Sequence, residues 1–414
     1  MAYDGTLKFD TSIDEKGFQS GVSKLGSFAG KAMKATTKVI GAASTAIGAF
    51  GAASLKVGMN FESAMANVGA ISGASGKEME QLSAKAQEMG AKTKFSASEA
   101  ADAFSYMAMA GWKTGDMMNG IEGIMNLAAA SGEDLAQTSD IVTDALTAFG
   151  MSAKDSGHFA DIMAAASSNA NTNVSLMGET FKYVAPVAGA LKFSAEDTAV
   201  AIGLMANAGI KGSQAGTSLR AIMTSLAKPT KQSEAAFKKL GVSLTDGNGK
   251  VKSLNTIMKE LRGSFANLTD AQKAEYAATI AGQHGMSGLL AIVNASDSDY
   301  EKLSSAVAGC TNELTGYSAA SEMAEKQLDN LQGDITILQS ALEGFQIAIS
   351  QGMTGTARVV VQEATGMVNA LQDAFKSGGF DAMVDKAGEV FGTLATKILN
   401  GTPKLIDSAE RLIN

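Results

Sequence analysis

Apolar side chains recur at steps of three and four residues along much of the chain, as they do in helices that bury one face. The pattern is sharpest near the carboxyl end, in Leu328, Leu331, Ile335, Leu338, Leu342, Phe345 and Ile349. Weaker seams follow two glycine hinges, through residues 360–371 after Gly352 and Gly355 and through residues 380–398 after Gly378 and Gly379. These seams predict amphipathic helical rods that need partner helices, in the same chain or in another copy.

A second heptad pattern begins at Met33 and continues to residue 64. Inside it, residues 39–55 carry no charge, which corresponds to about 25 Å of helix, near the lower limit for crossing a bilayer. Most of these side chains are small, so we interpret the segment first as a helix-packing seam. A membrane segment, inserted on demand or permanently, is the alternative. Residues 3–14 alternate with period two and predict a short strand.

Three helix starts in the middle of the chain repeat one another. Ser96, Ser152 and Ser194 each precede an acidic residue by three positions, which is the pattern of a capping box. Each start is followed at the same offset by Met-Ala-x-Ala, about three turns into the helix. The pattern from Ser131 to Asp134 predicts a further capping box. This reuse of one helical unit indicates packing or assembly more than chemistry.

Proline and glycine predict the limits of further elements. Pro186 predicts a kink or an end in one helix, and Pro229 predicts the end of the next. Residues 242–252 predict a small hairpin with Asp-Gly and Asn-Gly at its turn. Helices are then expected from Leu254 to Phe265 and from a cap at Thr269 and Asp270 to about Asn294, the latter broken between residues 282 and 288.

Together these patterns predict an all-α fold: a multi-helix core with repeated capped helices, one small β-hairpin, and coiled-coil-like amphipathic helices at both ends. Four segments are expected. Residues 1–60 form a strand and a basic, apolar heptad helix, and residues 61–235 form the helical core with three repeats. Residues 236–320 form the hairpin plus helices, and residues 321–414 form the rods with glycine hinges. Only three of the 414 residues are Pro, which agrees with a largely helical chain.

Charge and cysteine content exclude several classes of protein. The formal net charge of −8 argues against general nucleic-acid binding. Six lysines and no acid lie between Lys16 and Phe61. We interpret this basic arm as a solvated helix face, while an acidic partner, a membrane surface and DNA stay open as alternatives. The single cysteine, Cys310, excludes an intrachain disulfide framework and a zinc finger.

Candidate chemistry is sparse. The two histidines, His158 and His284, lack the spacing of metal ligands and are expected on a surface or in helix packing. Nothing in the sequence joins His284 to Cys310 as a thiol nucleophile. Trp112 and Phe95 are expected in the core of the first repeat, with a partner contact as the alternative. No catalytic, cofactor-binding or metal-binding residue is predicted, and the chain is not expected to be an enzyme.

The cluster Gly209, Gly212 and Gly216 superficially resembles a phosphate-binding loop, but the Lys-Ser/Thr that should follow the last glycine is absent. A joint between two helices that approach closely is the preferred interpretation.

The segment from Ala208 to Thr230 resembles the core region of phage tail tape-measure proteins. Matching pieces follow in the same order at residues 61–68, 185–188, 240–250 and 280–290, so the resemblance covers about residues 55–345. The residues of the most specific segment form the family signature: Gly209, Lys211, Gly212, Ala215, Gly216, Thr217, Leu219, Arg220 and Pro229.

The resemblance implies a structural protein of a phage, prophage or phage-tail-like particle. Such proteins lie in the tail tube lumen as several parallel copies, template the assembly and length of the tube, and are released during genome ejection. The implied partners are other copies, the tail tube protein, tail-tip or baseplate proteins, tail assembly chaperones and, on ejection, the host membrane. No cofactor and no specific nucleic-acid recognition are implied. The implied location is the virion tail lumen, after synthesis in the bacterial cytoplasm.

Two alternatives remain at this stage. A membrane-active helical protein, forming pores or aiding delivery without a measuring role, would use residues 39–55. A cell-wall hydrolase is disfavoured because the hydrolase module that some family members carry is missing. Many members also carry long helical arms beyond the core, whereas this chain ends at Asn414. We therefore expect either a short tail or one part of a split or truncated protein.

Overall fold

The computed structural model describes residues 53–312 and 317–351, together with scattered positions between residues 366 and 386. Residues 57–348 form one compact unit, and residues 1–56 with 349–414 are assigned to another. The expected strand at residues 3–14, most of the amino-terminal heptad helix and the last two seams lie outside the described residues. The division into four segments stays a prediction.

The described chain is all-α, as the sequence predicts. Its helices are α3 (Gly76–Lys92), α4 (Ala97–Met109), α5 (Thr114–Ser131), α6 (Leu135–Phe149), α7 (Ser156–Asn169), α8 (Val174–Ala190), α9 (Ala195–Asn207), α10 (Gly212–Ala227), α11 (Lys231–Leu240), α12 (Leu254–Phe265), α13 (Asp270–Asn294), α14 (Asp297–Ala308) and α15 (Ala319–Leu328). Residues 53–72 and 331–351 are also helical. Strands β1 (Thr311–Asn312) and β2 (Tyr317–Ser318) pair antiparallel, an element that the sequence did not predict.

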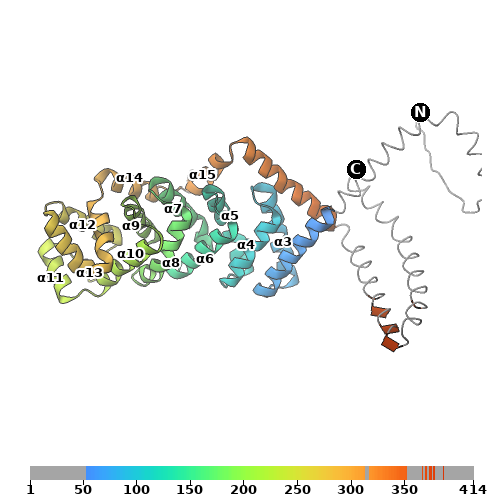
Figure 1. Ribbon diagram of the computed structural model, residues 1–414, viewed down its shortest axis with the longest axis horizontal. Coiled ribbons are helices and arrows are strands. Elements are labelled where there is room, and N and C mark those ends of the chain that lie inside the picture. The colour runs from blue at the N-terminus through green and yellow to red at the C-terminus, as the bar shows by residue number, and fades with distance from the viewer. Residues whose placement is uncertain are drawn as a thin grey trace, which may run out of the picture. The chain divides into compact units, whose positions relative to one another are not determined.

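Successive helices alternate between two layers. Helices α4, α6, α8, α10 and α13 pack one on the next in the first layer, while α5, α7 and α9 do so in the second. Helices α4, α6, α8 and α10 begin at residues 97, 135, 174 and 212, which are 38 or 39 residues apart. Figure 1 shows the pairs following one another from α3 to the group α11–α13. The unit is therefore a stack of two-helix repeats, each of which buries its apolar face against its neighbours.

The three predicted helix starts are present, but they do not mark this structural period. Ser96 and Ser194 cap α4 and α9, and Ser152 precedes a 3₁₀ turn, η1 (Ala153–Asp155), directly before α7. Helix α4 belongs to the first layer, whereas α7 and α9 belong to the second. The sequence repeat thus marks similar caps on helices of different layers.

The predicted capping box from Ser131 to Asp134 is wrong. Helix α5 continues through Ser131, whose hydroxyl donates to the carbonyl of Leu127 at 2.8 Å, and Gly132 then ends the helix in a left-handed conformation. The side chain of Asp134 caps α6 by accepting from the amide of Gln137 at 2.9 Å. A left-handed glycine between the two polar residues places them on different helices.

Most of the element limits predicted at prolines and glycines are found in the structure, but the one at Pro186 is not. Helix α8 continues through Pro186 to Ala190, so the residue does not end it. Helix α10 stops at Ala227, two residues before Pro229, as predicted. The predicted hairpin is present as a tight turn in which Thr245 pairs with Val251. The limits of α12 and α13 agree with prediction, and the break in α13 lies at Gly282, whose φ is 67°.

After α14 the chain runs back along the stack (Figure 1). Helix α15 packs on α5 and α7, and the following helix, residues 331–351, reaches the joint between α3 and α4. There the hydroxyl of Ser340 donates to the carbonyl of Lys94 at 2.8 Å, and the amide of Ser98 donates to Glu343 at 3.1 Å. We call residues 319–351 the return strap. The seam predicted from Leu328 to Ile349 lies on the helix of residues 331–351, except that its first member, Leu328, ends α15.

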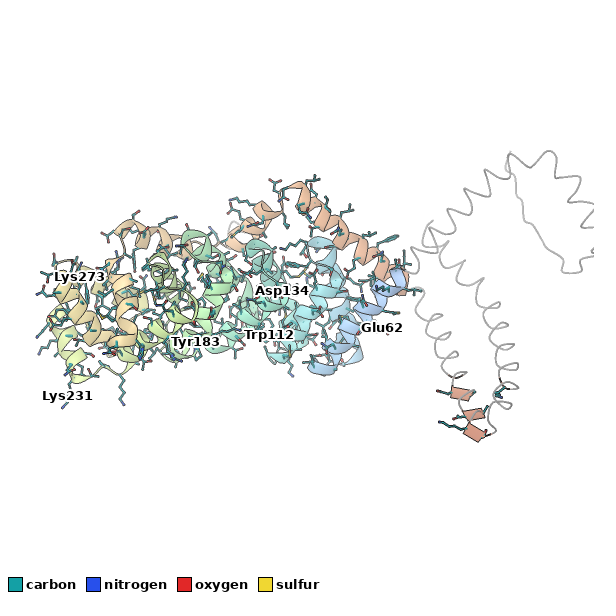
Figure 2. The ribbon with its side chains drawn as sticks, viewed as in Figure 1. Glu62, Trp112, Asp134, Tyr183, Lys231 and Lys273 are labelled. Atoms are coloured by element: carbon teal, nitrogen blue, oxygen red, sulfur yellow. The ribbon has the colours of Figure 1, made fainter. Side chains whose placement is uncertain are left out.

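Small residues set the spacing between neighbouring helices of one layer. A Cβ atom on Gly123 would lie 2.6 Å from the Cα atom of Gly157, so α5 and α7 touch backbone to backbone. Gly120 makes room for the ring of Trp112, which is buried as expected, and Phe95 is buried too. In Figure 2 Trp112 lies within the stack. Close approach of this kind depends on the absence of a side chain at each glycine.

Two glycines of α5 allow a matched test of this packing. Gly123→Ala should lower the free energy of unfolding by about 2–3 kcal/mol, because the new methyl group overlaps the backbone of α7. Gly115→Ala, whose new methyl group would meet no atom within 4 Å, should raise it by up to about 1 kcal/mol through helix propensity. Urea unfolding followed by circular dichroism measures both. Equal effects of the two substitutions would contradict backbone contact between α5 and α7.

Candidate functional site

The predicted signature residues form the joint between α9 and α10 and the helix that follows it. Gly209 and Gly212 both adopt left-handed φ values, 85° and 57°, and they turn the chain between the two helices. The carbonyl of Gly212 accepts a hydrogen bond from the hydroxyl of Thr180 at 3.0 Å. A Cβ atom on Gly212 would lie 2.5 Å from a carboxylate oxygen of Glu179. The joint is therefore held against α8, in agreement with the preferred interpretation of the glycine cluster.

Helix α10 buries one face of the signature and exposes the other. Ala215 and Leu219 are fully buried, and a Cβ atom on Gly216 would lie 2.6 Å from the Cβ atom of Tyr183 on α8. Lys211 is the N-cap residue of α10, although its side chain makes no capping hydrogen bond. Thr217 and Arg220 point the other way, toward a pocket. Pro229 follows this helix, one residue before the cap of α11.

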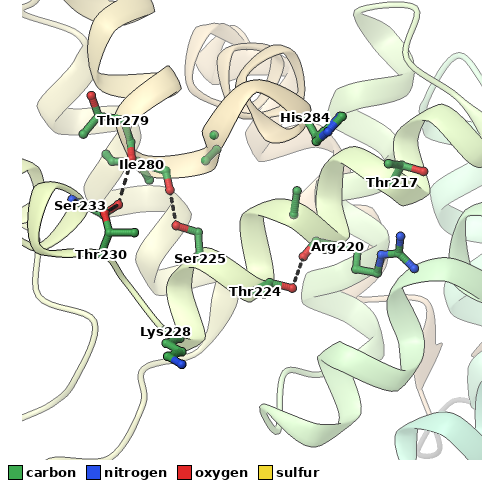
Figure 3. A pocket seen from close by; sticks show the side chains of 13 residues that line it. Thr217, Arg220, Thr224, Ser225, Lys228, Thr230, Ser233, Thr279, Ile280 and His284 are labelled. Atoms are coloured by element: carbon green, nitrogen blue, oxygen red, sulfur yellow. Dashed lines mark hydrogen bonds between the residues drawn. The ribbon is translucent and has the colours of Figure 1, made fainter.

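This pocket has a volume of about 580 Å³ and lies between α10, the start of α11 and the break in α13 (Figure 3). Its lining residues are Thr217, Arg220, Ala221, Thr224, Ser225, Lys228, Thr230, Ser233, Thr279, Ile280, Ala281, Gly282 and His284. The signature thus contributes only Thr217 and Arg220 directly. Ala221, Thr224, Ser225 and Lys228 come from α10 and its end, whereas residues 279–284 come from α13, which the sequence alone did not bring together with α10.

The break in α13 shapes one wall of the pocket. Because Gly282 is not helical, carbonyls just before it need partners outside the regular helix pattern. The hydroxyl of Ser233 donates to the carbonyl of Thr279 at 2.9 Å, and the hydroxyl of Ser225 donates to the carbonyl of Ile280 (Figure 3). Helices α10 and α11 are thereby attached to α13 by side chains rather than by apolar contact alone.

The charged side chains that line the pocket are all basic. Arg220, Lys228 and His284 line it, and none of the lining residues is acidic. The Arg220 guanidinium lies 5.8 Å from the centre of the Tyr183 ring, a cation–π contact that leaves its N–H donors available. Within the described part of the chain, the side chains of Lys228 and His284 form no ion pair or hydrogen bond. The arrangement suits binding of an anion and includes no nucleophile–base pair.

A second polar cluster attaches the return strap to α7. Asp161 is 2% exposed, and its carboxylate accepts three hydrogen bonds. The donors are the hydroxyls of Thr311 at 2.7 Å and Ser318 at 2.6 Å, and the amide of Ala320 at 2.9 Å. A buried carboxylate is tolerated when its oxygens are satisfied in this way. Asp161 therefore positions both strands and the start of α15 on the stack.

His158 extends the same cluster to α9. Its Nδ1 lies 2.9 Å from the hydroxyl of Thr311, which already donates its proton to Asp161, and its Nε2 lies 2.8 Å from a carboxylate oxygen of Glu196. Both ring nitrogens must then donate, which requires the imidazolium form. The side chains of Cys310 and Glu196 beside the ring raise the pKa of His158 to about 10. The hydrogen bond from His158 in turn lowers the pKa of Glu196.

The sequence offered no sign of this pairing. His158 lies beside Cys310, whereas His284, the histidine weighed against this cysteine, lines the pocket at the break in α13. The hydrogen-bonding pattern of His158 is that of a structural link between α7, α9 and the return strap. Within the described residues, no group of three or more His, Cys, Asp and Glu side chains is placed to hold a metal ion. The helices in this part of the chain are also too short or too polar to cross a membrane.

Comparison with known proteins finds a family model and relatives that match this chain. Residues 83–282 match the family model of phage-related minor tail proteins. The chain is 38% identical over 355 residues to the tape measure protein of Pneumococcus phage Dp-1, covering 86% of this chain and 30% of that protein. It is 28% identical over 402 residues to the probable tape measure protein of Escherichia phage P2, covering 92% and 48%. The chain thus spans less than half the length of either relative. No solved structure matches it.

The His158–Glu196 pair predicts a defined pH dependence of stability. The pKa of His158 is raised to about 10 in the folded protein, from 6.5 in the unfolded chain. The contribution of His158 to the free energy of unfolding is therefore complete below pH 6.5 and is lost as the pH rises through 10. Since the pKa of Glu196 is lowered from 4.5, its contribution is lost as the pH falls below that value. The pair should therefore stabilise the fold most between about pH 4.5 and 6.5.

Substitution of each histidine tests this dependence. The two side chains are 39% and 37% exposed, so solvent screening limits the pair to roughly 1 kcal/mol or less. His158→Gln should lower the melting temperature by about 2 °C at pH 6, and the difference from the wild type should shrink toward pH 10. His284→Gln is the control and should show no such trend. A difference for His158→Gln that stays constant from pH 6 to 10 would exclude the ion pair.

Proposed function

Because the chain belongs to the phage tail tape-measure family, we propose that it is a structural tape-measure protein of a phage tail. The observation that carries this proposal is the 38% identity to the Dp-1 tape measure protein across 86% of the chain. In this role copies of the chain lie in the lumen of the tail tube, template its assembly and length, and leave during genome ejection. Partners would be the tail tube protein, tail-tip or baseplate proteins and assembly chaperones.

An outward-facing seam on the return strap supports assembly of several copies. In the helix of residues 331–351, Ser340 and Ile347 are buried against the stack. Leu331 and Leu338, on another face, are 75% and 67% exposed, and Ile335 and Leu342 are exposed as well. The helix thus packs on its own chain mainly through other positions and presents a row of leucine and isoleucine to the surroundings. Such a row is stabilised when it meets another apolar helix.

The residues beside this seam favour parallel association with a second, identical chain. The four exposed residues occupy alternating a and d positions of a heptad repeat, and Gln332 and Gln339 occupy successive e positions. Ala341 occupies the g position that would face such a glutamine in a parallel neighbour. Asp334 occupies the preceding g position and would face Gln339, so it meets no like charge in a parallel copy. The seam therefore supports parallel association, which the tape-measure role requires of its copies.

The alternative of a membrane-active protein rests on residues 39–55. All but the last three of these lie outside the described residues, so this function stays a prediction from sequence. No observation in the described part of the chain favours it. We propose no enzymatic activity.

Association through the seam can be measured directly. Leu331→Gln combined with Leu338→Gln should weaken self-association of the full chain at least about tenfold, because two leucine side chains lose their burial. The control combines Met59→Gln and Met109→Gln, which remove similarly exposed apolar side chains (62% and 59%) away from the seam. Sedimentation equilibrium measures all three proteins. A wild-type chain that stays monomeric at high concentration, or equal loss in both variants, would contradict the seam.

The measuring role is tested by lengthening the chain in its phage. An insertion of 56 residues in heptad pattern after Gln351 should lengthen tails by about 80 Å, rounded to whole tube rings, because each helical residue adds about 1.5 Å. Electron microscopy of the particles gives the tail length. Scrambled insertions that contain proline serve as the control and should not produce this increment. Tails of unchanged length in normal number would mean that the chain does not determine tail length.

A further inference from the structure

The unit of residues 57–348 has one basic region in an otherwise acidic stack. Residues 208–252, which include α10, α11 and the predicted hairpin, carry eight Lys or Arg and two acidic residues. Residues 57–207 carry eight basic and seventeen acidic residues. Lys231 lies at the α11–α13 end of the unit and Glu62 toward the α3 end (Figure 2). A chain of net charge −8 therefore concentrates positive charge at one end of its stack.

The pocket described above lies in this basic region. Arg220 and Lys228 are exposed, and neither side chain forms an ion pair within the described residues. Basic side chains elsewhere in the unit are often neutralised, as in the pairs Lys182–Asp140 and Arg262–Asp297, both at 2.8 Å. A pocket lined by cations without a neighbouring acid attracts anions, because their mutual repulsion is relieved when an anion binds.

The remaining lining residues indicate what kind of anion fits. Ser225 and Ser233 donate their hydroxyl hydrogens to carbonyls of α13, so they are not available as donors to a ligand. Ala221 is partly exposed, and Thr224, whose hydroxyl donates to the carbonyl of Arg220, adds a methyl group, so apolar surface lies between the cations. A free phosphate would use the cations but leave this surface uncovered. A peptide with acidic and apolar side chains satisfies both.

We propose that this pocket binds an acidic peptide segment of a partner protein. Carboxylates of the segment pair with Arg220 and Lys228, and an apolar side chain covers Ala221 and the methyl group of Thr224. A nucleic acid fits less well, because the acidic remainder of the stack repels a long polyanion and no Phe, Tyr or Trp lines the pocket to stack on a base. This inference goes beyond the tape-measure role and does not depend on the seam.

Fluorescence anisotropy with a defined probe tests the pocket. The probe is a fluorescein-labelled octapeptide of alternating Glu and Leu, titrated with the full chain at about 50 mM salt, where exposed charges are weakly screened. We expect saturable binding that weakens at least about fivefold when Gln replaces Glu in the peptide. Arg220→Gln combined with Lys228→Gln should produce a similar loss. Thermal unfolding of this variant checks that the fold is intact.

The matched control is Lys77→Gln combined with Lys302→Gln, which removes the same charge from exposed lysines on α3 and α14. It should keep the affinity for the peptide within about twofold of the wild type. Equal losses of peptide affinity in both variants would mean that the peptide is held by general electrostatic attraction, which would overturn the proposal. A labelled 20-residue oligothymidylate that binds more tightly than the peptide and is lost with Arg220 and Lys228 would assign the pocket to nucleic acid instead. Absence of peptide binding to the wild type would also overturn it.

Discussion

The stack depends on how closely its helices approach one another. Gly123 against Gly157, Gly189 against the carbonyl of Ala148, and Gly216 against Tyr183 are contacts in which a methyl group has no room. With backbones this near, alanine side chains are long enough to fill the space between neighbouring helices of a layer, and dispersion contacts accumulate without large side chains. The abundance of Gly and Ala in the sequence is thus a packing requirement, and the relative scarcity of aromatic residues follows from it.

Local signals in the sequence predicted local structure well. Capping serines, the turn residues of the hairpin and the proline after α10 each act within a few residues, and the structure agrees with them. The exception at Ser131 has a local cause too, because Gly132 ends the helix between the two polar residues. The 38-residue period was harder to recognise, since caps resemble one another on helices of both layers while buried residues differ between repeats.

Features that join distant segments could not be predicted in the same way. Thr217 and Arg220 were identified as signature residues, but His284 and Thr279 reach the same pocket only because α13 breaks beside α10. Asp161 and Thr311 are 150 residues apart, and no pattern near either residue indicates the other. The apolar seam of residues 328–349 was visible in the sequence. That it faces away from its own stack follows from the contacts of Ser340 and Glu343 with the α3–α4 joint.

The return strap also bears on how the protein folds as it leaves the ribosome. Each two-helix repeat contacts mainly its neighbours, so the stack can form progressively while synthesis continues. The strap instead joins Ser340 to Lys94, 246 residues earlier, and Asp161 to Ala320, 159 residues later. These contacts close only after most of the chain has emerged. Until then the surfaces of α5 and α7 that receive α15 are uncovered, which makes the nascent stack the form most in need of protection from aggregation.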